Sequence, residues 1–335
     1  MTTTSLPPIR TETTPCLLCR TDASLVLGEI WMDSQLLGRM VQCQRCRLRF
    51  LSPRPSQAQR DWLYAQEYDH NLPGKDGETR FATVHGDQDR SLTRFARYLR
   101  ELEPVRRRVE RPRLLDVGAG TGQLMALAKE RGWEVFAVEP SEDACQFLRQ
   151  QFGAASVVGR DVQELRGEAG QYDGIIMAHV IEHLADPLAD LRLVRRLLAP
   201  GGRLVVATPN ESSFYDWLWQ VRQRRRGGGA ASPYVMIRWE NGCWYRTPAR
   251  EDAGGLIEFQ ILTTEHVYFF TRGTLGQLVQ RSGFSRIRWA RGSAARAHSR
   301  LGRFFRNDVT NGALFLLGSQ VELVAVAEQR DEMQA

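Results

Sequence analysis

Two histidines and a glutamate occur in the order H-x-x-E-H at positions 179 to 183. One class of zinc peptidases holds its metal with this order, and a histidine beside a reacting substrate can also accept a proton. His179 and His183 are four residues apart and Glu182 is three from His179, so the three side chains are expected on one helical face. The stretch therefore allows two predictions, a metal clasp or a catalytic base.

Four cysteines form two C-x2-C pairs near the amino terminus, Cys16 with Cys19 and Cys43 with Cys46. Two such turns that face each other supply the four sulfur ligands that zinc prefers. A redox C-x-x-C needs only one pair at the start of a helix, whereas the residues between these pairs resemble short strands. Because four thiolates leave no open coordination position, the pattern predicts a structural zinc that takes no part in catalysis.

A buried-strand run ends at Asp116 and is followed by Gly118, Gly120 and Gly122, then by a helical pattern. Glycines in such a turn let backbone N–H groups approach a ligand, and the start of the helix favours a carboxylate or phosphate. The dinucleotide pattern G-x-G-x-x-G would require glycine where Gln123 stands, which disfavours a nicotinamide cofactor.

Further strands are predicted to end at Glu139, at Asp161 and just before His179. Strands alternate with helices from about residue 112 to 210, and this alternation predicts an α/β fold with a parallel sheet covered on both faces. Ligands on such sheets lie at the carboxyl ends of the strands. Glu139 is placed to accept hydrogen bonds from both hydroxyls of a ribose, and Asp161 from an adenine amino group.

Four segments, "LDVGAGTG", "VEPS", "YDGIIMAHVIEHLADP" and "LAPGGRLVVATPN", follow one another as the motifs of class I S-adenosylmethionine-dependent methyltransferases do. The chain resembles the small-molecule branch that includes the ubiquinone-pathway O-methyltransferases, over about residues 111 to 292 and the closing strand. The resemblance implies a Rossmann-like sheet and S-adenosyl-L-methionine as cofactor. It places Asp116 and residues 118 to 122 at the methionine part, Glu139 at the ribose and Asp161 at the adenine. The cysteine pairs are similar to the zinc ribbon of sugar C-methyltransferases.

Three parts of the chain are predicted: a zinc ribbon with a following helix at 1–75, a linker and helix at 76–110, and the methyltransferase domain at 111–335. Residues 211–262 are predicted to form a lid insertion over the active site. Its aromatic side chains either form a wall against a sugar or planar ring, or pack the lid onto the sheet. They are Tyr215, Trp217, Trp219, Trp239, Trp244 and Tyr245.

An amphipathic helix with a basic face is predicted from the spacing of Arg296, Arg300, Arg303 and Arg306. That face meets solvent, a phosphate group or an anionic lipid surface, so peripheral membrane contact stays open. The formal net charge is +6 over 335 residues. The cations are almost all arginine and lie in scattered clusters, which disfavours a nucleic-acid partner. No basic start with an apolar stretch and no long uncharged apolar run occurs, so a cytoplasmic location without a transmembrane segment is expected.

The function predicted from these features is methyl transfer from S-adenosyl-L-methionine to a small molecule, such as a sugar or secondary metabolite, with O-, N- or C-methylation open. His183 is predicted to be the base that takes a proton from the acceptor, with His179 as the second candidate. Two alternatives are an RNA base methyltransferase with a zinc module and a non-catalytic zinc-ribbon protein that binds nucleic acid. The metal clasp at 179–183 would need a third ligand downstream, such as Glu251 or Glu258. The oligomeric state is left open.

Overall fold

The structure is a computed structural model that describes residues 8–32, 35–61, 88–210, 235–240, 243–248, 266–290 and 322–329. The chain forms two compact units. The cysteine unit comprises Met1–Thr83 and Tyr215–Phe269, and the Rossmann-like unit comprises Val84–Phe214 and Phe270–Ala335. Both units are therefore built from segments that are distant in sequence.

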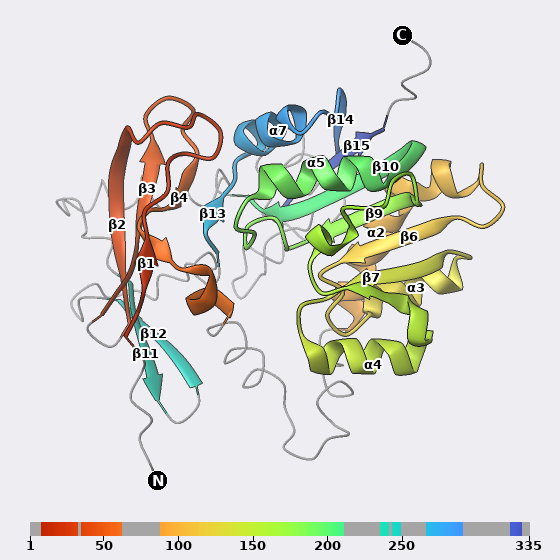
Figure 1. Cartoon of the computed structure of the whole chain (residues 1–335), viewed down its shortest axis with the longest axis horizontal. Coiled ribbons are helices and arrows are strands. Elements are labelled where there is room, and N and C mark those ends of the chain that lie inside the picture. Colours follow the sequence, from red (N-terminus) through yellow and green to blue (C-terminus); the bar gives the residue numbers. More distant parts are fainter. Residues whose placement is uncertain are drawn as a thin grey trace, which may run out of the picture. The chain divides into compact units, whose positions relative to one another are not determined.

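A seven-stranded sheet forms the centre of the Rossmann-like unit, in the order β14-β15-β10-β9-β6-β7-β8 (Figure 1). Its strands are β6 (Arg113–Val117), β7 (Glu134–Val138), β8 (Val157–Gly159), β9 (Tyr172–Ala178), β10 (Leu198–Pro209), β14 (Arg286–Ala290) and β15 (Glu322–Glu328). The strands from β6 to β10 pair in parallel, whereas β15 is antiparallel to both β10 and β14. The predicted parallel sheet over residues 112 to 210 is confirmed.

Five helices of this unit are described, and their starts follow from local hydrogen bonding. They are α2 (Gln88–Arg106), α3 (Gln123–Glu130), α4 (Glu142–Phe152), α5 (Pro187–Leu197) and α7 (Arg272–Arg281). Ser141, Asp186 and Thr271 each stand just before a helix, and their side chains accept a backbone N–H of the first turn. Two 3-10 turns, η2 (Ala154–Ser156) and η3 (Val162–Leu165), flank β8.

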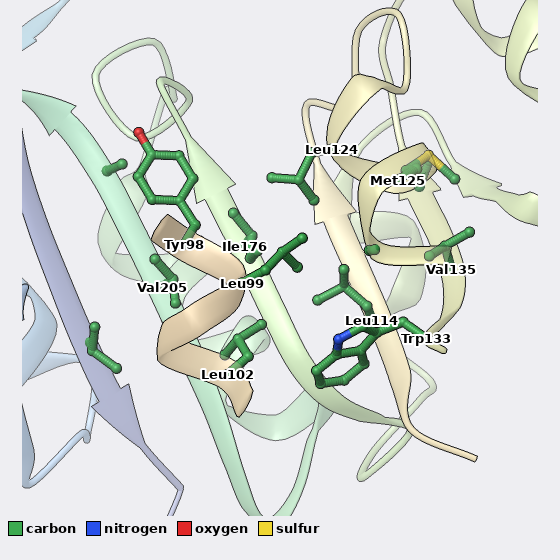
Figure 2. Close-up of a cluster of buried hydrophobic side chains, with 14 of the residues drawn as sticks. Tyr98, Leu99, Leu102, Leu114, Leu124, Met125, Trp133, Val135, Ile176 and Val205 are labelled. Atoms are coloured by element: carbon green, nitrogen blue, oxygen red, sulfur yellow. The ribbon is translucent and has the colours of Figure 1, made fainter. Parts of the chain in front are cut away.

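Both faces of the sheet are buried. Along β9, the consecutive residues Ile175, Ile176 and Met177 are all inaccessible to solvent. Since neighbouring residues of a strand point to opposite faces, helices must cover both sides. On one face, Leu99 and Leu102 of α2 join the same core cluster as strand residues that include Ile176 (Figure 2). Elsewhere in the unit, α5 and α7 contact each other and pack on β10 and β15, respectively.

The helix predicted within 76–110 corresponds to α2, and it is part of this core. A Cβ on Gly174 of β9 would lie 2.8 Å from Leu102 Cδ1, so α2 lies directly on the sheet. Tyr98, Leu99 and Leu102 are each no more than 1% exposed. The Rossmann-like unit, which comprises Val84–Phe214 and Phe270–Ala335, therefore includes α2.

A six-stranded sheet forms the cysteine unit, in the order β12-β11-β2-β3-β4-β13. The strands are β2 (Ser24–Met32), β3 (Gln35–Cys43), β4 (Arg49–Leu51), β11 (Val235–Glu240), β12 (Cys243–Pro248) and β13 (Tyr268–Phe269), while β1 (Thr11–Glu12) pairs separately with β5 (Arg54–Pro55). β11 and β12 come from the predicted lid insertion, and β11 pairs in parallel with β2. The described strands of that insertion thus belong to the sheet of the cysteine unit.

Several predictions concern residues outside the described ranges. These are the arginine helix around 296–306, the linker part of 76–110 before α2, the possible clasp ligands Glu251 and Glu258, and the lid aromatics Tyr215, Trp217 and Trp219. Among the described helices, none has both the length and the apolar character needed to span a membrane.

Candidate active site and cysteine cluster

The glycine turn after β6 combines close packing with open space. Gly118, Gly120 and Gly122 all have positive φ, at 77°, 53° and 72°. A Cβ on Gly118 would lie only 2.5 Å from Val180 Cγ2, whereas a Cβ on Gly120 would meet no atom within 4 Å. Gly118 is therefore required by packing and backbone conformation, while Gly120 leaves its backbone open to an approaching ligand.

Replacing Gly118 by alanine is expected to destabilise the Rossmann-like unit by about 3 kcal/mol. The left-handed backbone costs an L-residue about 1–2 kcal/mol, and the overlap with Val180 adds about 1–2 kcal/mol. Gly170→Ala is the matched control, because Gly170 has φ 63° and no atom within 4 Å of a Cβ. Denaturant titration should show a clearly smaller loss for the control; equal losses would contradict the packing of Val180 on the turn.

Glu139, at the end of β7, is hydrogen-bonded to the glycine turn. Its side chain is buried, with Oε2 accepting from Gly120 N at 2.8 Å and Oε1 accepting from Ser141 N at 2.9 Å. Burial raises the pKa of Glu139 despite these two donors. Burial also raises the pKa of Asp116 to about 7, with the charge of Glu139 as a second cause. Two buried carboxylates side by side favour a positively charged ligand.

A cavity of about 250 Å³ lies at the carboxyl ends of β6 and β9. Its lining comes from α2, the glycine turn, α3 and the end of β9: Arg94, Phe95, Asp116, Gly118, Ala119, Leu124, Ala178 and His179. Three predicted site residues, Asp116, Gly118 and His179, thus meet at one cavity, as expected for strand ends of a parallel sheet. Glu139 is connected to this site through Gly120.

Five predicted site residues of this unit are not among those that line the cavity: Gly120, Gly122, Glu139, Asp161 and His183. Asp161 is exposed and its Oδ1 accepts from Gln163 N at 2.8 Å, at the start of η3. His183 is half-buried, and its backbone N–H donates to Val180 O at 2.9 Å.

The H-x-x-E-H stretch is a turn and not a helix, so the expected shared helical face is wrong. His179 has φ 58°, and residues 181–183 form a turn before α5. The cause is the sheet, because His179 N donates to Ala207 O at 2.8 Å and so extends the pairing of β9 with β10. The first helical residue comes only after Asp186, which caps α5.

The ring of His179 lies between two buried carboxylates. Its Nε2 is 2.9 Å from Glu322 Oε1, and its Nδ1 is 3.5 Å from Glu182 Oε1. Burial alone would lower the pKa of His179, but the hydrogen bonds with Glu182 and Glu322 outweigh it and raise the pKa to about 9. The ring is therefore an imidazolium at neutral pH. A metal ion would have to displace a ring proton before His179 could be its ligand.

Sequence reasoning missed three residues near this ring: Arg94 and Tyr98 on α2, and Glu322 at the start of β15. Glu322 is 143 positions from His179, and no spacing pattern connects them. One signal was present, since Glu322 is an acidic residue directly before an apolar strand run. A carboxylate in such a position needs a partner if the strand is buried.

The four predicted zinc ligands are close together in the cysteine unit. The Sγ atoms of Cys16, Cys19, Cys43 and Cys46 all lie within 4.8 Å of one another. These four cysteines and Cys145 are free thiols. The predicted juxtaposition of the two C-x2-C turns is confirmed.

The two cysteine turns repeat one backbone geometry. Arg20 N donates to Cys16 O at 2.8 Å, and Arg47 N donates to Cys43 O at 3.0 Å. Arg20 and Arg47 each follow the second cysteine of a pair and have φ 54° and 67°. Each turn thus brings its two thiols to the same side, and β2 and β3 place the two turns opposite each other.

The thiols differ in acidity. Burial raises the pKa of Cys43, but backbone N–H groups of Cys46 and Arg45 outweigh it and lower the pKa to about 7. Burial raises the pKa of Cys46, with contributions from the neighbouring thiols. Four thiolates at this distance repel one another unless a cation lies between them.

Comparison with known proteins gives consistent results. A family described as a methyltransferase domain matches residues 87–288, more than half of the chain. The ubiquinone biosynthesis O-methyltransferase of Caulobacter sp. (strain K31) is 35% identical over 130 residues, 37% of this chain and 50% of that protein. An uncharacterized protein of Mycobacterium tuberculosis (strain ATCC 25618 / H37Rv) is 32% identical over 193 residues, 55% of this chain and 65% of that protein.

The chain spans about half the length of the ubiquinone-pathway relatives that it matches, 50% and 45%. A crystal structure of a SAM-dependent methyltransferase from Archaeoglobus fulgidus is 19% identical and covers 72% of this chain and 95% of its own, with a TM-score of 0.46. The family match runs from just before α2 into β14 and so includes the glycine turn and the whole cavity. By this match and its Rossmann-like sheet, the chain belongs to the methyltransferase-domain family, among the class I S-adenosylmethionine-dependent methyltransferases.

Proposed function

We propose that the chain transfers a methyl group from S-adenosyl-L-methionine to a small molecule. The observation that carries this proposal is the cavity at the ends of β6 and β9, where an open glycine turn meets the buried carboxylate of Asp116. The ubiquinone-pathway relatives support a small-molecule acceptor. Whether oxygen, nitrogen or carbon receives the methyl group is left open.

The residues present fit the charged groups of S-adenosyl-L-methionine. Asp116 is placed to accept hydrogen bonds from the ammonium group of its methionine part. Arg94 also lines the cavity, and among the described residues its buried Nε has no hydrogen-bond partner, so it suits the carboxylate. Glu139 accepts one N–H on each oxygen and keeps lone pairs for the ribose hydroxyls. Asp161, at the end of β8, is proposed for the adenine amino group.

The bound cofactor supplies an electrophilic methyl group, and the chain has to orient the acceptor and remove its proton where one must leave. Because His179 is held as an imidazolium, it does not suit the role of proton acceptor at neutral pH. His183 stays the proposed base. Val180 packs on Gly118, so the turn that carries His183 lies against the glycine turn.

Glu139→Ala is expected to weaken binding of S-adenosyl-L-methionine by about 2 kcal/mol or more, which is about 30-fold. The substitution removes a charged acceptor and leaves the N–H groups of Gly120 and Ser141 without their carboxylate. Glu142→Ala is the control, because it removes the same charge from a side chain that is 51% exposed. Calorimetry that finds equal affinities for Glu139→Ala and the wild type would reject the ribose assignment.

We also propose that the four cysteines hold one structural zinc ion. In a tetrahedral site with Zn–S bonds of about 2.3 Å, the sulfur atoms lie about 3.8 Å apart. The four sulfur atoms of this chain all lie within 4.8 Å of one another. They would have to move only slightly closer together to reach the spacing of a zinc site. An all-cysteine site leaves no open position, so the metal would stabilise the cysteine unit and leave the reaction to the other unit.

The acceptor class can be tested with isotopically labelled S-adenosyl-L-methionine, cell extracts and a panel of nucleotide-sugars. Transfer of label to a low-molecular-weight product is the expected result. Transfer of label to RNA, with salt-dependent binding, would instead support the RNA base methyltransferase. Failure to bind the cofactor at all would support the non-catalytic alternative.

A further inference from the structure

The ring of His179 is contacted from β15, from the turn that follows β9 and, through Arg94, from α2. Glu322 of β15 and Glu182 of the following turn contact its two nitrogens, at 2.9 Å and 3.5 Å. Tyr98 Oη on α2 donates to the same Glu322 oxygen at 2.6 Å. Glu182 and Glu322 are 1% and 3% exposed, so neither carboxylate can rely on water for its charge.

The proton positions follow from these distances. Arg94 Nη1 is 3.3 Å from His179 Nε2, farther than the carboxylate of Glu322. Nε2 cannot both accept from Arg94 and donate to Glu322, and the shorter, charge-assisted contact favours donation to Glu322. With Nδ1 facing Glu182 as well, both ring nitrogens carry protons. Two buried anions thus face the ring, and the guanidinium of Arg94 is a second cation beside it.

The backbone of His179 is also under constraint. Its φ of 58° is unusual for a residue with a side chain, and such conformations persist where the surroundings hold them. Here the surroundings are the hydrogen bond from His179 N to Ala207 O and the two carboxylates on the ring. The ring in turn forms part of the cavity lining.

We propose that Glu322 is a positioning residue which, together with Glu182, holds His179 as an imidazolium in the wall of the cofactor cavity, with a carboxylate facing each ring nitrogen. This inference rests on the proposed function, because it assigns the cavity to the cofactor. It gives the buried acid at the start of the last strand a role in the site. It also explains why His179, although it stands at a strand end, has no ring nitrogen with a lone pair that could accept a proton.

A pH dependence follows from the groups that face the ring, which are Glu182, Glu322, Tyr98 and Arg94, with Asp116 in the same cavity. The pKa of His179 is raised to about 9, so the charged form is favoured in the folded chain. The stabilisation it gives is fully present below about pH 6.5 and is lost as the pH rises through about 9. The cavity wall should therefore stay in place through neutral pH and loosen in alkali.

The test is an NMR titration of His179 in the full chain, with the signal assigned by its loss in His179→Gln. The wild-type ring should carry protons on both nitrogens at pH 7 and titrate near pH 9. In Glu322→Gln the pKa of His179 should fall by about one pH unit or more, because the charge that favours the imidazolium is gone. Tyr98→Phe is the matched control: it removes a donor from Glu322 but keeps the carboxylate, so the pKa of His179 should not fall.

Binding of S-adenosylhomocysteine, followed by calorimetry from pH 6 to 10, provides a second readout. Above pH 7, where Asp116 is ionised, wild-type affinity should be constant to about pH 8 and fall several-fold above 9, and in Glu322→Gln the fall should begin at lower pH. Glu322→Asp keeps the charge and should restore most of the wild-type profile if Glu322→Gln folds poorly. A wild-type His179 pKa below 7, or an unchanged His179 pKa in Glu322→Gln, would overturn the proposal. The titration needs no cofactor, so a chain that gives the expected titration but binds no S-adenosylhomocysteine would contradict the proposed function instead.

Discussion

Cys43→Ser is expected to abolish zinc binding and to unfold the region around β2 and β3. Serine lacks the thiolate that zinc prefers, and structural zinc contributes about 10–16 kcal/mol of apparent binding energy in small zinc domains. The cluster joins the turn before β2 to the turn after β3, and Cys16 and Cys43 are themselves 0% exposed. Metal analysis should find one zinc per wild-type chain and none in the variant, and amide exchange in β2 and β3 should accelerate.

Cys145→Ser is the control for this experiment. Cys145 is also a buried thiol, but it belongs to the Rossmann-like unit, where its Sγ donates to Glu139 O at 3.0 Å. Its replacement should leave the zinc content unchanged. The zinc proposal would be wrong if freshly prepared, reduced wild-type protein contained no zinc.

His183→Ala should leave cofactor affinity and zinc content nearly unchanged and reduce turnover by about 10²- to 10⁴-fold. This is the range expected when a positioned base is removed from a proton-transfer step. Neither the cavity lining nor the cysteine cluster includes the side chain of His183, so binding and metal content should be preserved. Single-turnover assays with an acceptor found by the labelling screen would measure the effect.

His183→Gln separates proton transfer from pocket shape. Glutamine keeps a polar side chain of comparable length but cannot accept a proton at neutral pH. Turnover should remain low in this variant if His183 is the base. Normal turnover in either variant would reject that role, and loss of a second metal ion from His183→Ala, with the cysteine site still loaded, would restore the clasp.

Much of the Rossmann-like unit was predictable because its signals are local. Each strand from β6 to β9 contains a short apolar run, and glycines or capping residues separate it from the next helix. Asp116, Gly118 and His179 could be placed near one site because parallel strands end at the same edge. The zinc ligands were equally predictable from the sequence, since two C-x2-C turns determine which thiols can meet.

Other features depend on pairing between distant segments and have no local signal. The turn at residues 181–183 arises because β10 continues to pair with the chain at His179. The helical spacing of the sequence gives no sign that this strand pairing prevents a helix. The parallel pairing of β11 with β2 joins segments about two hundred residues apart. Glu322 contacts His179 only because β15 pairs with β10 in an antiparallel direction.

The position of β15 has a consequence for how the chain matures on the ribosome. Residues 322–328 form an inner strand of the sheet, between β14 and β10, although they are the last described strand to be synthesised. A nascent chain that has already made the glycine turn and His179 still lacks Glu322. Since domains generally fold as units during synthesis, the site matures only when its final strand emerges. A truncated translation product without β15 would thus have an exposed strand edge on β10, which favours pairing with other chains, and a His179 without its contact to Glu322.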